Sequence, residues 1–175
     1  MNSSVICTFV GRDKPGLVES LAKAVDACHG SWLESSSAQL AGQFAGIVRI
    51  AIDETHLATL QQRIAALQSK ELQLQLRDGE SGQIASPSGS PLQLTAVGND
   101  RPGIVHEISQ ALAAAGLNVI KMDTSLSSAA MSGDTLFHSR MLLSKPDGGD
   151  IDALESQLDS IAERLTIEID LDDER

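Results

Sequence analysis

Apolar side chains recur along the chain with two periods, one near 3.6 residues and one of two residues. The helical period appears in Leu17, Val18, Leu21, Val25 and Cys28, and again in Ile104, Val105, Ile108, Leu112 and Ala115. It also appears in Leu57, Leu60, Ile64 and Leu67, and in Ile151, Leu154, Leu158 and Ile161. Strict alternation follows in Leu72, Leu74 and Leu76, and in Ile167, Ile169 and Leu171. These patterns predict four amphipathic helices and two half-buried strands.

The elements come in two sets because the sequence repeats itself. Thr8–Val18 aligns with Thr95–Val105 at an offset of 87 residues, whereas the second helices align at an offset of 94. The second copy therefore has about seven extra residues. We expect them at Ser128–Thr135 and in the Pro146–Gly149 turn, where Gly, Ser and Pro cluster. Two more strand-like stretches lie between the helices of each copy, at residues 32–39 and 44–52 and at residues 118–127 and 136–144.

Each copy thus reads strand, helix, strand, strand, helix, strand, which is the order of a ferredoxin-like βαββαβ unit. The expected fold is α+β, with two tandem units whose antiparallel sheets carry helices on one face. We expect the first unit at residues 1–78, a Gly/Ser/Pro-rich linker at 79–91 and the second unit at 92–175. A sheet with helices on one face leaves its other face and its edges open, and we expect either the sister unit or the same unit of another chain to cover them, the latter giving a homo-oligomer such as a homodimer.

The charge balance bears on possible partners. Thirteen basic and 24 acidic residues give a net charge of −11, which opposes direct binding to nucleic acid. With one Trp, three Phe and no Tyr, the chain also lacks a stacking surface for single strands. No apolar run approaches the roughly 20 residues that span a bilayer, and the start has no signal-peptide pattern. We therefore expect a cytoplasmic protein without a membrane partner, in which Cys7 and Cys28 are buried thiols.

Patterns of catalytic and metal-binding chemistry are absent from the sequence. The four histidines are scattered and form no zinc-like pair with one another, so we expect no metal site. The sequence has no Walker loop, Rossmann glycine pattern or nucleophile elbow, and we expect no cofactor and no catalytic residue. A small ferredoxin-like enzyme would need a perturbed acid or base in a pocket, and the sequence offers no such pair.

Two similar turns are the local features that favour a binding site. Each joins the first strand of a copy to its first helix, where backbone N–H groups and the helix dipole attract a carboxylate. The candidate ligand-binding residues are Gly11, Arg12, Asp13, Pro15 and Gly16 in the first copy and Gly98, Asn99, Asp100, Arg101, Pro102 and Gly103 in the second. Asp13 or Asp100 would hold the ammonium group of such a ligand. The same residues are also ordinary turn formers, so a purely structural role stays open.

At these turns the sequence resembles the ACT-domain family of ligand-binding regulatory modules. The resemblance rests on Gly11–Val18, Gly98–Val105 and Gly116–Val119, and it covers essentially the whole chain as two domains in tandem. With Trp32–Ser35 and Arg140–Ser144, the chain is also similar to the family of glycine cleavage system transcriptional repressors. That family has no DNA-binding domain and contacts a LysR-type activator in response to glycine. The resemblance implies a small amino acid such as glycine or serine as ligand and a LysR-type protein as partner.

The turns depart from one pattern of the ACT family. In the serine-binding ACT domains of phosphoglycerate dehydrogenase the turn reads His-x-Asn-x-Pro-Gly, whereas here Gly11 and Gly98 stand at the His position and Asp13 and Asp100 at the Asn position. By the same match Asn118 is the ligand's partner on a neighbouring strand, which favours the second copy. The alternative is an interaction module that dimerises or holds a partner without a ligand.

Overall fold

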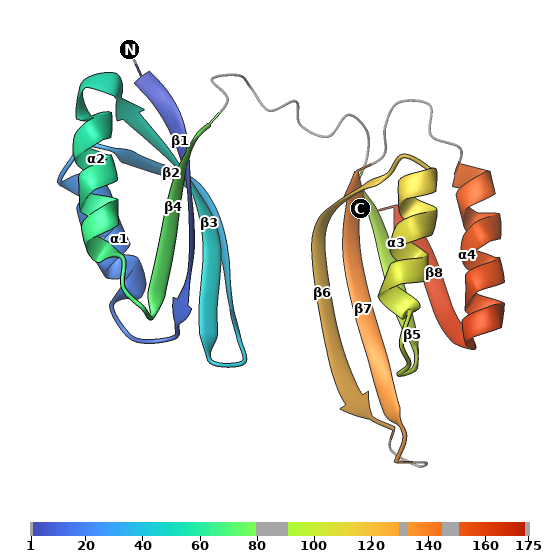
Figure 1. Cartoon of the computed structure of the whole chain (residues 1–175). Helices are drawn as coiled ribbons and strands as arrows, with labels where there is room; N and C mark the ends of the chain where they lie inside the picture. The colour runs from blue at the N-terminus through green and yellow to red at the C-terminus, as the bar shows by residue number, and fades with distance from the viewer. Residues whose placement is uncertain (1, 80–90, 130–132, 145–150, 174–175) are drawn as a thin grey trace. The chain divides into compact units, whose positions relative to one another are not determined.

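The computed structural model describes residues 2–79, 91–129, 133–144 and 151–173, and the chain divides into two compact units, residues 1–84 and 85–175. The first unit contains β1 (Asn2–Arg12), α1 (Leu17–Asp26), β2 (Ser31–Leu40), β3 (Gln43–Asp53), α2 (Glu54–Leu67) and β4 (Leu72–Asp78). The second contains β5 (Leu92–Asn99), α3 (Ile104–Ala114), β6 (Asn118–Ser128), β7 (Thr135–Ser144), α4 (Ile151–Leu165) and β8 (Ile167–Asp173) (Figure 1). Residues 80–90, most of the expected linker, lie outside the described residues.

The two units have the same sheet topology. Each sheet has four strands, in the order β2-β3-β1-β4 in the first unit and β6-β7-β5-β8 in the second, and every neighbouring pair is antiparallel. Within each unit both helices lie on one face of the sheet (Figure 1). The prediction of two tandem ferredoxin-like units is confirmed.

Each unit has its own hydrophobic core between its helices and its sheet. Most of the predicted helix positions are buried, as are Cys7 and Cys28, both free thiols. The prediction was wrong for Val18, whose side chain is 45% exposed, while its equivalent Val105 is half-buried. Successive helix residues are about 100° apart around the axis, so Val18 lies beyond the edge of the stripe that contains Leu17 and Leu21.

Most of the second copy's extra residues lie in its central hairpin. Gly11 pairs with Phe44 in the first sheet, and its equivalent Gly98 pairs with Phe137 in the second. The offset is 87 at the glycines but 93 at the phenylalanines, so six residues have been added between them. The β6–β7 loop lies within Ser128–Thr135, as predicted. The predicted Pro146–Gly149 turn lies outside the described residues.

The cores of the two units are filled differently at one equivalent pair of positions. In the first unit Phe9 pairs with Gly46, and a Cβ built on Gly46 would lie 2.5 Å from Cζ of Phe9. In the second unit Ala96 pairs with Ser139 at the same place in the sheet. A large side chain facing glycine has thus been replaced by two small ones. Among the described residues, the buried hydroxyl of Ser139 has no hydrogen-bond partner.

A β-bulge interrupts the edge strand of each sheet at the same position. The register shifts between Trp32 and Glu34 in β2 and between Val119 and Lys121 in β6. The residues at the bulges, Leu33 and Ile120, are 48% and 46% exposed. The outer edges of β2 and β6 carry no further strand of the same sheet.

Candidate functional site

The first candidate turn connects β1 to α1 and is held by backbone hydrogen bonds at its start. The N–H of Arg12 donates to the O of Glu71 at 3.0 Å, and the N–H of Asp13 donates to the O of Gly42 at 2.9 Å. Lys14 Nζ lies 3.6 Å from a carboxylate oxygen of Glu71. The turn is therefore tied to the start of β4 and to the β2–β3 hairpin.

The second candidate turn connects β5 to α3 and has one more contact, made by a side chain. The N–H of Asp100 donates to the O of Thr135 at 2.8 Å, as in the first turn. In addition, Nη2 of Arg101 donates to the O of Arg164 at 3.1 Å, at the C-terminal end of α4. A cation there interacts favourably with the helix dipole. The sequence prediction that Arg101 contacts a ligand did not foresee this use of the side chain, because its partner lies 63 residues away along the chain.

Both helices that follow the turns begin without a side-chain cap. Gly16 and Gly103 are the N-cap residues, with φ of +89° and +101°, and neither helix has a side-chain cap hydrogen bond. The first N–H groups of each helix thus point into the turn, as the anion-binding hypothesis requires. Each first turn also has its own carboxylate, since Glu19 and Glu107 approach the glycines. These carboxylates compete electrostatically with an incoming anion.

The aspartates of the turns keep their carboxylates free. Asp13 and Asp100 are exposed, and within the described part of the chain neither side chain has a hydrogen-bond or ion-pair partner. In an ordinary Asp-containing turn the side chain accepts a backbone N–H. Here the turns are fixed by main-chain bonds instead, so the carboxylates are available to a ligand's ammonium group.

Packing explains the glycines at the starts of the turns. A Cβ on Gly98 would lie 2.3 Å from Cγ2 of Ile167, and one on Gly11 would lie 2.6 Å from the backbone O of Glu71. A histidine, which the serine-binding pattern has at this position, does not fit either place without displacing the neighbouring edge strand. Gly11 and Gly98 therefore act in strand packing and supply no side chain to a ligand.

Asn118 does not join the second turn within one unit. It opens β6, where it pairs with Ser144, whereas Asn99 closes β5 and pairs with Leu136. Leu92, at the start of β5, pairs with Leu143, next to Ser144, so Asn118 lies at the opposite end of the sheet from Asn99. Leu136 and Ser144 are eight residues apart on β7, so at about 3.3 Å per residue the separation along the strands is roughly 26 Å. Asn118 therefore does not lie beside Asn99 within one unit, because α3 returns the chain to the starting end of the sheet before β6 begins.

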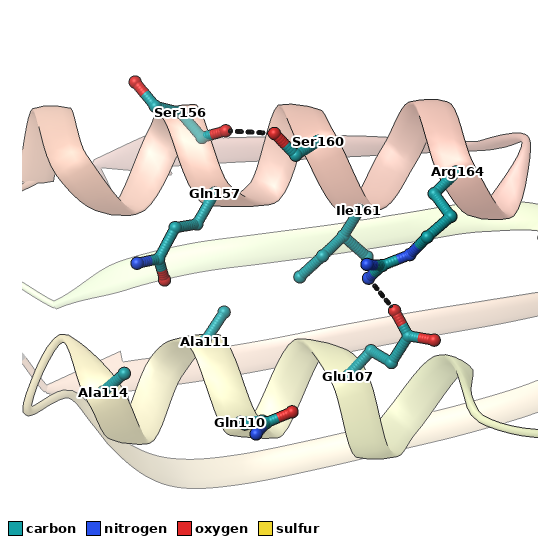
Figure 2. A pocket seen from close by; sticks show the side chains of 9 residues that line it. All are labelled: Glu107, Gln110, Ala111, Ala114, Ser156, Gln157, Ser160, Ile161 and Arg164. Atoms are coloured by element: carbon teal, nitrogen blue, oxygen red, sulfur yellow. Dashed lines mark hydrogen bonds and ion pairs between the residues drawn. The ribbon is translucent and has the colours of Figure 1, made fainter.

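Two hollows lie near the second turn. One, of about 570 Å³, lies beside the end of β5 and includes Gly98, Asn99 and Thr166 in its lining. The other, of about 600 Å³, is a groove between α3 and α4, where an ion pair between Arg164 and Glu107 spans one end (Figure 2). Ala111 and Ile161 also line this groove, and the hydroxyl of Ser160 donates to the O of Ser156. In the groove, Glu107 is paired with Arg164, and the hydroxyls of Ser156 and Ser160 donate to backbone oxygens of α4, so neither serine is hydrogen-bonded to that carboxylate.

Other kinds of site find little support in the described residues. They hold no group of three or more His, Cys, Asp or Glu placed to bind a metal ion. Among them, no helix is both long and apolar enough to cross a membrane. The pKa of the Cys7 thiol is raised to about 11 by burial, which opposes the reactive thiolate form.

Comparisons with known proteins concern the fold and the family of the chain. The family model of the ACT domain matches the chain twice, at residues 3–77 and 90–172. Among solved structures, an unknown protein from Galdieria sulphuraria aligns over 100% of both chains, with 24% identity and a TM-score of 0.87. A candidate glycine cleavage system transcriptional repressor aligns over 98% of this chain and 97% of its own, with 16% identity and a TM-score of 0.71. At these identities the two structures show a shared fold. No curated protein gave a significant match.

Proposed function

The chain belongs to the ACT domain family, and from that premise we propose that it is an amino-acid-sensing regulator that acts through a protein partner. The observation that carries the proposal is the pairing, in each turn, of a free aspartate with an uncapped helix N-terminus. The N–H groups bind the ligand's carboxylate and the aspartate binds its ammonium group. The carboxylate and the ammonium group of a small amino acid such as glycine or serine are then bound within a few ångströms of each other.

The second turn is the better candidate of the two. Asn99 adds a neutral amide beside Asp100, where the first turn has Arg12 beside Asp13. A cation beside Asp13 weakens that carboxylate's attraction for an ammonium group. The main ligand-binding residues are therefore Asn99 and Asp100 with the backbone N–H of Gly103, in a turn whose shape Pro102 helps to set.

We further propose that a second copy of the chain completes this site. The outer edge of β6 is free in its own sheet. Antiparallel pairing of β6 with β6 of a second copy brings the start of one strand to the end of the other. Asn118 of the second copy then approaches the sheet end that holds Asn99, which the same residue of the first copy cannot reach. A homodimer with two equivalent sites is expected.

Regulation of transcription, as in glycine cleavage systems, fits the fold shared with the candidate repressor. A net charge of −11 disfavours direct binding to DNA, so the contact with a promoter is assigned to a second protein such as a LysR-type activator. A gel shift with submicromolar affinity for DNA in the absence of any partner would contradict this assignment.

The alternative function is an interaction module that binds no amino acid. One observation favours it: Glu19 and Glu107 already place carboxylates beside the helix N-termini. If these carboxylates suffice to offset the helix dipoles, the turns need no ligand.

Calorimetric titration of the whole chain with glycine and with serine distinguishes the two functions. Asp100→Ala should weaken binding by about 1.5–3 kcal/mol, the scale of a hydrogen bond to a charged group. Asp13→Ala tests the first turn in the same way, and Asp159→Ala, which removes an exposed carboxylate from α4, is the matched control. Unchanged affinity in both turn variants rejects the site. The absence of heat with any amino acid supports the interaction module.

A further inference from the structure

The uncovered face of the second sheet carries a polar hollow that is separate from the turns. Its volume is about 560 Å³, and β5, β6 and β7 contribute to its lining. On β7, Met141 and Leu143 are buried on the helix-covered face, so His138 and Arg140 lie on the opposite, open face. Thr124 and Ser139 also line the hollow, but by strand alternation they belong to the other face; the polar side chains on the open face are those of Thr95, Asp123, Ser125, Ser127, His138 and Arg140.

The strand register brings these side chains together in two rows across the sheet. Arg140 pairs with Thr95 on one side and with Asp123 on the other. His138 pairs with Val97 and Ser125, and its Nε2 lies 2.7 Å from the hydroxyl oxygen of Ser127. A guanidinium, an imidazole and three hydroxyl groups thus converge on one hollow.

The charge of Arg140 is available to a ligand. Asp123, its cross-strand neighbour, forms an ion pair with Lys121 at 3.0 Å. Within the described part of the chain, Arg140 itself has no ion pair and is exposed. An uncompensated guanidinium beside hydroxyl donors is the usual protein recognition group for a carboxylate or a phosphate.

The first unit provides an internal control for this cluster. Its sheet has the same register, and Thr8 and Val10 stand where the second unit has Thr95 and Val97. Opposite them are Ile47 and Ala45, in place of Arg140 and His138, and Ala38 replaces Ser125. The same fold therefore forms with apolar side chains at the positions of His138 and Arg140, and folding does not require the cluster.

We propose that Arg140 and His138, with the hydroxyls of Thr95 and Ser125, bind a small carboxylate anion on the open face of the second sheet. Glu168 and Asp170 of β8 pair with Val97 and Thr95, one strand away from the cluster. Together with Asp123 they repel multiply charged anions more than a monoanion. A monocarboxylate is therefore favoured over phosphate.

The test is an NMR titration of the ¹⁵N-labelled whole chain with acetate, which has a carboxylate but no ammonium group. Saturable shifts are expected around His138 and Arg140, with at least tenfold weaker binding in Arg140→Gln. His138→Ala, which introduces the first unit's residue, should also weaken binding while leaving the thermal unfolding temperature unchanged. Arg77→Gln, on the first sheet, is the matched control and should leave the affinity unchanged.

Other outcomes overturn the proposal. Acetate binding that is absent, or equally strong in Arg140→Gln, rejects the site. Tighter binding of inorganic phosphate than of acetate rejects the preference for a monocarboxylate. The two sites can be told apart by the amides that shift: those around His138 and Arg140 report this site, whereas those of Gly103 and Ile104 report acetate bound by the N–H groups of the turn.

Discussion

Adding a methyl group at Gly46 tests whether the two cores are filled in alternative ways. The new Cβ of Gly46→Ala would lie 2.5 Å and 2.8 Å from ring atoms of Phe9 and 2.7 Å from Cβ of Ser37. The Phe9 ring is buried and lies 5.5 Å from the ring of Phe44, so it has little room to turn. Overpacking of this kind costs about 1–3 kcal/mol, against a gain of about 0.4–1 kcal/mol from stiffening the unfolded chain. We expect a net loss of stability.

The second unit shows how the clash is relieved, since Ala96 stands at the position of Phe9 and Ser139 at that of Gly46. Phe9→Ala alone should destabilise the first unit by about 3–5 kcal/mol by leaving a cavity. In the double variant the added methyl group occupies part of that cavity without meeting a ring. The double variant should therefore be more stable than the sum of the single effects predicts, by about 1–3 kcal/mol.

Trp32 makes the measurement selective for the first unit. It is the one tryptophan of the chain and packs, half-buried, against that unit's core, so its fluorescence in a urea titration follows that unit. Gly42→Ala is the control, because Gly42 has a φ of +77° and no atom within 4 Å of the added Cβ, so it measures backbone strain alone. A Gly46→Ala variant as stable as wild type, or effects that add within about 0.5 kcal/mol, would refute the reasoning.

Three further predictions concern single side chains. Ser139→Ala should leave the second unit equally stable or up to about 1 kcal/mol more stable in thermal unfolding, because the buried hydroxyl lacks a partner; a loss above that size would contradict this. Because the pKa of Cys7 is raised from 9.0 to about 11, stability should fall as pH rises above about 9, and a thiol reagent at pH 8 should modify Cys7 only after unfolding. Hydrogen bonds from the backbone N–H and the hydroxyl of Thr55 lower the pKa of Asp53 from 3.8 to about 2, so its stabilising effect is present above pH 4 and lost as pH falls toward 2. Asp53→Asn should remove that part of the pH dependence of the unfolding temperature, and identical profiles would argue against it.

Much of the fold follows from patterns in the sequence because each element buries one face. Apolar spacing shows which side of a helix faces the core, as for Leu60 and Ile64. Apolar alternation does the same for a strand, as for Leu72 and Leu74. The internal repeat also located most of the extra residues, since an insertion that keeps both strands paired must fall in the hairpin between them. The pattern did not predict that Val18 is exposed, because an apolar residue beside a buried one need not itself be buried.

The candidate site was harder to predict because it depends on directions and on contacts distant in sequence. Asn118 follows the second turn closely in the sequence, yet the crossover helix α3 carries the chain to the other end of the sheet before β6 starts. The cluster around Arg140 was missed for a different reason. Polar residues that alternate with buried ones in a strand are typical of any solvent-facing surface, and this cluster stands out only by comparison with Ile47 and Ala45 at the equivalent positions of the first sheet.

The bulges at Leu33 and Ile120 bear on how the protein avoids aggregation. A long, regular edge strand is a template for the open-ended addition of further chains, which leads to fibres. A bulge increases the local twist and breaks the run of evenly spaced main-chain donors and acceptors. In both β2 and β6 the regular part of the edge begins only after the bulge, at Glu34 and at Lys121. Charged side chains at these two positions favour short, finite strand pairing over stacking into fibres.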